Sequence, residues 1–324
     1  MGYIKTILEN IDGWTPPVVG EDIPHGDMPG DKVQIGPDHI RKAEKVFGRL
    51  LELLPEAVER SASGRVVIAV CGGSGVGKSE IASLLSHYFR CLGIGSYTLS
   101  GDNYPHRIPR YNDAERLRLF RQAGVRGLVA AELLTAPVFA ELRDLQDREA
   151  DADMANVEKY PWFAAYLDSA LAGLRGYLGT DREIDFAEIS RIVSQFKAGE
   201  NHIWLKRMGR GESDLWYEKV DFTGIDVLVI EWTHGNSDNY AGVDIPVLLN
   251  STPEETLAHR RSRNRDGKTD SPFTMRVLEI EQGMLEAQAH KAKIILSKQG
   301  ELLSYAQYQA LMAESSGWKE GERP

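Results

Sequence analysis

The sequence predicts an α/β fold in which a mainly parallel sheet is covered by helices on both faces. Two observations along the chain indicate this fold. Short apolar runs alternate with segments of helical spacing, and a glycine-rich turn joins the first of those runs to a helix. Strands that alternate with crossover helices form parallel sheets. The length of 324 residues suffices for one large domain of this kind or for two smaller ones.

Composition narrows the partners and the compartment. The formal net charge of −10 argues against nucleic acid or an acidic membrane as the main partner. The two cysteines, Cys71 and Cys91, imply no disulfide framework and fit a reducing compartment. No stretch is long and apolar enough to span a membrane, and no signal-peptide pattern opens the chain. We therefore expect a cytoplasmic protein.

The elements follow in chain order. Residues 1–36 are rich in Gly, Pro and Asp without periodicity, which predicts an irregular N-terminal arm. Pro37 to Arg60 has apolar residues at helical spacing behind a proline suited to a first turn, which predicts a helix packed on the core. The strand candidates beyond it are Val66–Val70, Ser96–Leu99, Val227–Ile230, Ile245–Leu249 and Lys293–Leu296.

Two segments interrupt the alternation of strands and helices. Residues 112–180 are mostly helical by composition and too long for a simple connection, which predicts an inserted helical subdomain. Residues 202–221 form two strand-like runs around a glycine-containing turn, which predicts a β-hairpin. The core would then comprise residues 37–111 and 181–324.

The glycine-rich turn carries a recognisable chemistry. Gly72 to Ser79 fits the pattern G-x-x-x-x-G-K-[ST] between an apolar run and a helical segment. In this pattern backbone N–H groups and a helix N-terminus surround phosphate oxygens, the lysine reaches the β- and γ-phosphates, and the hydroxyl ligates Mg²⁺. The alternative, a chance glycine-rich turn, is disfavoured by that context. The pattern predicts the three-layer fold of P-loop NTPases, with phosphate bound by Gly73, Ser74, Gly75, Val76, Gly77, Lys78 and Ser79, and Mg²⁺ by Ser79.

Two carboxylates follow predicted strands, where ligands of parallel sheets bind. Asp102 can orient an acceptor hydroxyl and accept its proton, and its alternative role is a turn or a helix cap. Glu231 can hold Mg²⁺ directly or through water, and its alternative role is an ordinary strand end. His234 lies just beyond Glu231, where it would either shape the acceptor site or have a purely structural role.

Arginines and a histidine supply the remaining candidates. Arg260, Arg261, Arg263 and Arg265 would close over a triphosphate as a lid, His259–Gly267, with Asp266–Asp270 as the hinge; the alternative is a solvated basic face. His106, Arg107 and Arg110 follow Asp102 and would hold an anionic group of the acceptor, or are surface charges. The predicted acceptor-binding residues are Asp102, Tyr104, His106, Arg107, Arg110, Glu231 and His234.

Together these motifs resemble the uridine kinase/phosphoribulokinase family of P-loop kinases. The resemblance spans roughly residues 64–110 and 182–298 and includes Leu99–Tyr104 and Ser271–Arg276. It implies ATP as the donor, Asp102 as the general base, Glu231 near Mg²⁺ and an arginine lid over ATP. The departures from the family pattern, Asn103 after Asp102, Trp232 after Glu231 and the insertion, all fall on the acceptor side.

We therefore expect a kinase that uses ATP and Mg²⁺ to phosphorylate a hydroxyl of a small polar metabolite, sugar-like and with room for an anionic group. Lys78, Asp102, Arg261 and Arg265 would be catalytic, and Arg261 and Arg263 would contact the nucleotide. The alternatives are a regulatory P-loop protein that acts through a partner and a degenerate scaffold. No Asn-Lys-x-Asp motif of a GTPase is present. The sequence leaves the acceptor open, and it also leaves open a homodimer.

Overall fold

A six-stranded sheet forms the centre of the computed structural model, which describes residues 4, 7–8, 13–20, 23, 25–30, 33–263 and 271–316. The strand order is β2-β5-β1-β6-β7-β8. All neighbouring strands run parallel except β8, which pairs antiparallel with β7. The strands are β1 (Val66–Gly72), β2 (Ser96–Ser100), β5 (Val227–Glu231), β6 (Ile245–Leu249), β7 (Ile294–Leu296) and β8 (Leu302–Leu303).

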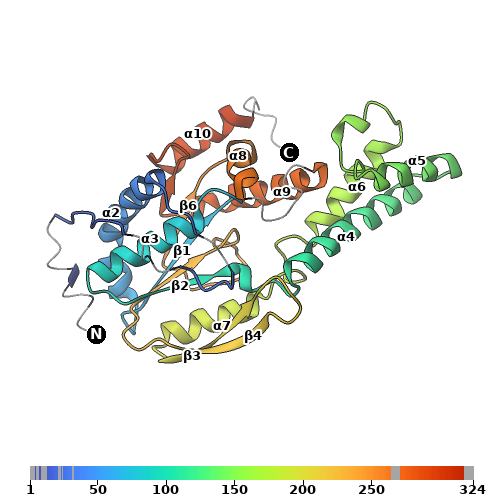
Figure 1. Cartoon of the computed structure of the whole chain (residues 1–324). Helices are drawn as coiled ribbons and strands as arrows, with labels where there is room; N and C mark the ends of the chain where they lie inside the picture. The colour runs from blue at the N-terminus through green and yellow to red at the C-terminus, as the bar shows by residue number, and fades with distance from the viewer. Residues whose placement is uncertain are drawn as a thin grey trace.

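Helices cover both faces of this sheet (Figure 1). On one face α2 (Pro37–Arg60) and α3 (Lys78–Cys91) form a buried cluster with alternate residues of β1, such as Ile68. On the other face α7 (Phe186–Lys197) packs against Val67 and its neighbours. A separate hairpin, β3 (His202–Met208) with β4 (Leu215–Asp221), joins that second cluster. Continuous burial of β1 follows from this double cover.

Three helices form an arm that projects away from the sheet (Figure 1). They are α4 (Pro109–Ala130), α5 (Ala136–Asp147) and α6 (Phe163–Arg175). Helices α4 and α6 pack so closely that a Cβ on Gly124 would lie 2.4 Å from the Tyr166 ring. The arm has its own apolar core, to which α9 (Pro272–Gln288) contributes Val277 and Ile280. Helix α9 thus links the arm to the sheet domain.

The remaining described elements are helices and short 3₁₀ turns. They are α8 (Pro253–Arg263), α10 (Tyr305–Ser316) and the 3₁₀ turns η1 (Gly101–Asn103), η2 (Met154–Asn156) and η3 (Ala289–Lys291). In the part of the chain that the structure describes, no helix combines the length and the apolar character needed to cross a membrane.

The predicted α/β fold with a mainly parallel sheet is confirmed. Each of the five strand candidates forms a strand of this sheet, and the hairpin is present. The antiparallel edge strand β8 was not predicted, because a two-residue strand leaves no periodicity to detect. Helix α4 begins at Pro109, three residues ahead of the predicted start of the helical segment.

Candidate active site

The phosphate loop lies between β1 and α3, and its shape requires glycine. Gly72 and Gly77 have φ angles of +155° and +100°, which L side chains rarely adopt. A Cβ on Gly72 would lie only 2.6 Å from the carbonyl oxygen of Leu249. Because Gly77 directly precedes α3, the loop places backbone N–H groups at the N-terminus of this helix, where the helix dipole favours an anion.

The polar side chains of this loop contact the loop backbone and the end of strand β5. Lys78 Nζ donates a hydrogen bond to the carbonyl oxygen of Gly73 at 3.0 Å, so the lysine spans the loop. Ser79 Oγ donates to Glu231 Oε2 at 3.2 Å, and Ser100 Oγ donates to Glu231 Oε1 at 2.5 Å. The register of the sheet explains this meeting, since Glu231 pairs with both Val70 and Ser100.

Ser79 and Glu231 fit a magnesium ion. Both present oxygen atoms, which are the ligands that Mg²⁺ prefers, and the buried carboxylate of Glu231 lies within hydrogen-bond distance of the loop hydroxyl. Among the described residues there is no group of three or more His, Cys, Asp or Glu side chains that could hold a metal. Mg²⁺ in phosphoryl-transfer sites is commonly bound by one or two protein oxygens together with substrate phosphates and water.

Asp102 is exposed, although it stands between two buried residues of the turn η1. Beneath it, Gly101 packs on the Trp232 indole so closely that a Cβ would lie 2.0 Å from Trp232 Cγ. On the other side the amide oxygen of Asn103 accepts a hydrogen bond from the Met208 N–H at 2.9 Å. The turn is therefore held from β5 and from the hairpin, and it presents Asp102 to the cavity described below.

A residue of the N-terminal arm supports the same turn. The buried carboxylate of Asp27 accepts hydrogen bonds from the backbone N–H of Ser100 at 2.7 Å and from the Asn103 amide at 3.0 Å. It also accepts from Tyr97 Oη at 3.1 Å and pairs with Arg207 at 2.9 Å. Burial raises the pKa of Asp27 to about 6, against the opposing effect of the Arg207 guanidinium. The sequence carried no signal for this residue, which lies in an irregular Gly- and Pro-rich segment.

A cavity of about 570 Å³ extends from the phosphate loop to the base of the helical arm formed by α4, α5 and α6. Its walls come from segments that are distant in sequence, and Asp102 lies among them. The loop contributes Ser74 and Gly75, so a phosphoryl group bound there would face the same space as Asp102. The other walls include Met28–Gly30, Asn112–Ala114, Arg116, Leu117, Arg121, Glu149, Asp151, Glu183, Arg210, Trp232–His234, Phe273 and Glu281.

A buried ion pair lies at the centre of this wall. Arg116 Nε contacts Glu183 Oε1 at 2.6 Å, and the same carboxylate accepts from Asn112 Nδ2 at 2.8 Å and from the Gly179 N–H at 2.6 Å. Burial alone would raise the pKa of Glu183, but Arg116 and these donors outweigh it and lower the pKa. Glu183 is therefore a carboxylate at neutral pH.

His234 also lines the cavity, although its side chain is largely buried. Burial lowers its pKa to about 4, so the imidazole is neutral near pH 7. Its ring packs edge-on against Trp232 with centroids 5.3 Å apart. A neutral imidazole can donate and accept hydrogen bonds but cannot balance a phosphate charge.

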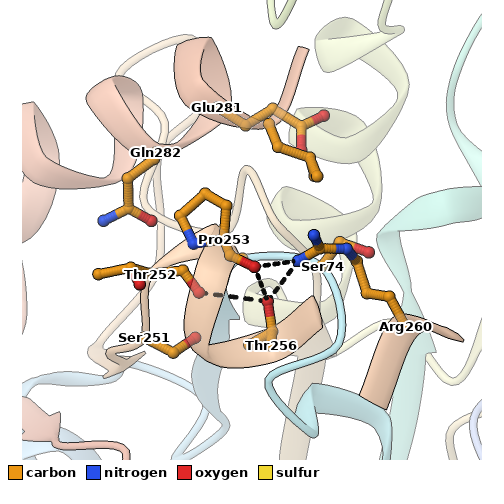
Figure 2. A pocket seen from close by; sticks show the side chains of 10 residues that line it. Ser74, Ser251, Thr252, Pro253, Thr256, Arg260, Glu281 and Gln282 are labelled. Carbon is orange, nitrogen blue, oxygen red and sulfur yellow. Dashed lines mark hydrogen bonds between the residues drawn. The ribbon is translucent and has the colours of Figure 1, made fainter. Parts of the chain in front are cut away.

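Arg260 lies against the phosphate loop (Figure 2). Its guanidinium donates to the Pro253 carbonyl and to Thr256 Oγ1, both at 2.6 Å, and its Cγ would be 2.9 Å from a Cβ on Gly75. A small cavity of about 10 Å³ opens there, and Figure 2 shows Glu281 and Gln282 of α9 on its far side. Arg260 of the predicted lid therefore contacts the phosphate loop.

The rest of the predicted lid is only partly described. Arg261 is exposed on α8. The side chain of Arg263, all of Arg265 and the proposed hinge Asp266–Asp270 lie outside the described residues, as do the other residues of the predicted lid His259–Gly267 beyond Arg263.

Five predicted acceptor-binding residues do not line the cavity: Glu231, which contacts Ser79 and Ser100 instead, and the four that follow Asp102 in sequence. Tyr104 is fully buried in the core beneath the sheet. His106 Nε2 lies 2.8 Å from the Asp181 carbonyl oxygen, Arg107 donates to Tyr177 Oη at 2.9 Å, and Arg110 is exposed at the start of α4. The prediction followed proximity in sequence to Asp102, but α4 begins at Pro109 and carries the chain away. The arginines that line the cavity are Arg116, Arg121, Arg210 and Arg260.

The parallel sheet, the glycine loop after β1 and the carboxylate that closes β5 define a P-loop nucleotide-binding protein. No protein-family profile matches the chain. The chain is 41% identical over 256 residues to the bifunctional alpha-galactosidase/sucrose kinase AgaSK of Mediterraneibacter gnavus. The match covers 79% of this chain but 22% of AgaSK, so the chain spans about a fifth of that relative's length.

Two solved structures are also similar. D-glycerate 3-kinase from Cryptococcus neoformans var. grubii matches at 14% identity with a TM-score of 0.44, over 81% of this chain and 97% of the kinase. A possible uridine kinase from Bacillus stearothermophilus matches at 15% identity with a TM-score of 0.37, over 78% of this chain and 98% of that one. Each of these three proteins is named as a kinase that acts on a small molecule.

Proposed function

We propose that the protein is an ATP-dependent kinase that transfers the γ-phosphoryl group to a hydroxyl of a small, sugar-like metabolite. One observation carries the proposal: a single cavity is lined both by Ser74 and Gly75 of the phosphate loop and by the exposed carboxylate of Asp102. Phosphoryl transfer needs the donor phosphate and the acceptor hydroxyl in one enclosed space. The sequence similarity to AgaSK, which is named as a sucrose kinase, supports the same reaction.

The donor end binds phosphate through backbone and charge. The loop N–H groups and the N-terminus of α3 would hold the β- and γ-phosphates, and Lys78 would exchange its bond to Gly73 for phosphate oxygens. Ser79 and Glu231 are the residues that would hold Mg²⁺, whose chemistry when bound is to offset phosphate charge. Arg260 would supply further positive charge from α8.

The acceptor end supplies the proton acceptor. Asp102 would orient the acceptor hydroxyl and take its proton as that oxygen forms a bond to the γ-phosphorus and the bond to the β-phosphate oxygen breaks, which releases ADP. Trp232 and Asn103 hold the turn that carries Asp102, so the carboxylate needs little rearrangement before the reaction. His234 would contribute a neutral hydrogen-bonding group to the same wall.

Several more detailed assignments belong to this proposal. The chain would divide into an irregular N-terminal arm (1–36), a kinase core (37–111 and 181–324) and a helical insertion (112–180). The protein would act in the cytoplasm, use ATP as the donor, and depend on Mg²⁺. Arg261, Arg263 and Arg265 would close over the nucleotide as a lid. A homodimer is compatible with all of these assignments.

The alternative is a regulatory P-loop protein that binds a nucleotide and acts through a partner. The acceptor-sized cavity around Asp102 favours transfer, because a switch needs no second substrate site. The two functions differ in what ADP release depends on. A kinase releases ADP when an acceptor is added, whereas a switch hydrolyses slowly with or without it.

The direct test is acceptor-dependent ADP release from MgATP with sucrose, glucose, fructose, D-glycerate and uridine, and mass spectrometry of the products. We expect sucrose or another sugar to be phosphorylated. Nucleotide binding without acceptor-dependent turnover across this panel and a wider metabolite panel would favour the regulatory alternative.

A further inference from the structure

The two arginines of α4 that line the acceptor side of the cavity are already paired with carboxylates. Each nitrogen of the Arg116 guanidinium lies within ion-pair distance of a different carboxylate. Nε contacts Glu183, Nη1 lies 3.6 Å from Asp113, and Nη2 lies 3.8 Å from Glu281. Arg121 makes a two-point pair with Asp151, at 2.8 and 2.9 Å. The guanidinium groups of α4 that line this wall are therefore compensated within the protein.

The balance of charge on the cavity wall is negative. Among the described residues that line it, six carboxylates face four arginines. One of these arginines, Arg260, lies at the phosphate loop rather than on the acceptor side. The carboxylates are those of Asp102, Asp113, Glu149, Asp151, Glu183 and Glu281.

An anionic acceptor would meet an unfavourable environment there. A phosphate or carboxylate group that took the place of Glu183 on Arg116 would leave a fully buried carboxylate without its ion pair. A guanidinium that already lies within 4 Å of three carboxylates has its positive charge offset, so it attracts an added anion only weakly. The site thus discriminates against negative charge by what it already contains.

An uncharged polyol would find matching groups in the same wall. Each hydroxyl both donates and accepts, so it can donate to carboxylate oxygens and accept from the amide of Asn112 or the edge of a guanidinium. Phe273, Leu117 and Val277 place apolar surface beside these polar groups, against which the C–H faces of a sugar ring can pack. This mixture of carboxylate, arginine and apolar groups suits a saccharide.

We infer that the base of the helical arm is the acceptor subsite, and that it selects an uncharged saccharide over its phosphorylated or acidic counterparts. Arg116, Glu183 and Glu281 form its centre, and Arg121 with Asp151 forms its outer wall. This inference rests on the proposed kinase function and narrows the acceptor, which the sequence left open to anionic compounds.

The first experiment compares matched acceptors. With MgATP and the full-length protein, ADP release is measured for glucose against glucose 6-phosphate and gluconate, and for sucrose against sucrose 6-phosphate. We expect kcat/KM for the uncharged member to exceed that of its anionic counterpart by at least about 100-fold. Turnover of the anionic members at equal or higher kcat/KM would overturn the inference and leave the kinase function intact. Absence of transfer to any acceptor would instead count against the proposed function.

The second experiment locates the subsite. Arg116→Gln and Arg121→Gln change the wall, whereas Arg118→Gln is a matched control, since Arg118 is exposed on the same helix and pairs with Glu115. We expect the first two to raise KM for the preferred saccharide by about 10-fold or more, with the Kd for ATP within twofold and Arg118→Gln unchanged. Arg121→Gln keeps the test valid if Arg116→Gln does not fold. Wall variants that behave like Arg118→Gln would show that the saccharide binds elsewhere.

Discussion

The two ends of the large cavity are built in opposite ways. The donor end is eight contiguous residues, Gly72 to Ser79, whose backbone does most of the binding. The acceptor end is assembled from the N-terminal segment at Met28, the turn at Asp102, helix α4, Glu183 and helix α9. The first end recognises a phosphate, which every nucleotide donor shares. The second end uses side chains from separate segments, so it can change its ligand without altering the first.

The supporting contacts differ in the same way. At the donor end, backbone angles and close packing exclude every residue but glycine at Gly72. At the acceptor end, buried ion pairs such as Arg116–Glu183 hold the side chains, and such pairs are costly to break but do not demand one residue type. The following predictions test whether the two ends are separable.

The largest effect is expected from Asp102→Asn. The amide keeps the size of the side chain but cannot take the acceptor's proton, so kcat should fall by about 10²–10⁴-fold while the Kd for ATP stays within a few-fold. Steady-state kinetics with the preferred acceptor and calorimetric ATP titration measure the two quantities. A mutant with a lowered melting temperature but an unchanged kcat would make Asp102 a structural turn residue.

A loss of about 10²–10³-fold in turnover is expected from Lys78→Ala, because the lysine offsets phosphate charge and is not part of the core. The acceptor end should be unaffected, so the relative preference among acceptors should persist in the residual activity. The melting temperature and the surface variant Lys45→Ala serve as controls. Near-normal turnover in the folded mutant would remove the phosphate-loop assignment.

Gly101→Ala should disturb the acceptor end alone. The added methyl group would lie 2.0 Å from the Trp232 ring, so either the turn or the indole must move, at a cost of about 1–3 kcal/mol in the free energy of unfolding. Displacement of Asp102 should lower kcat, while ATP affinity changes little. Urea denaturation and the kinetic assay check both parts. If ATP binding weakens as strongly as kcat falls, the two ends are mechanically coupled.

The smallest effect concerns His234. Its pKa of about 4 in the folded protein lies below the ordinary value of 6.5, so the unfolded chain binds the proton more readily. The stability that this group contributes is present above pH 6.5 and is lost as the pH falls toward 4. Between pH 7 and pH 5 the loss should be about 1–2 kcal/mol. Urea midpoints of wild type and His234→Gln across this range should show a shallower pH dependence in the variant; parallel curves would contradict the prediction.

What could be predicted from sequence divides along the same line. The strand, glycine loop and helix around Lys78 are one local unit, and parallel pairing brings strand ends such as Glu231 to the same edge of the sheet. Local pattern therefore sufficed for the fold and for the donor end. The roles of Lys78, Asp102 and Glu231 stay predictions, to be decided by the measurements above.

The acceptor end depended on contacts that no local pattern encodes. Arg107 and Arg110 are close to Asp102 in sequence, yet helix α4 directs Arg116 rather than either of them into the cavity. Asp27 meets Arg207 across 180 positions of the chain. The sequence by itself determined the fold class and the phosphate loop, because periodicity and glycine geometry act over neighbouring residues. Only the tertiary structure decided which charges face the acceptor, because a buried ion pair depends on where whole helices pack.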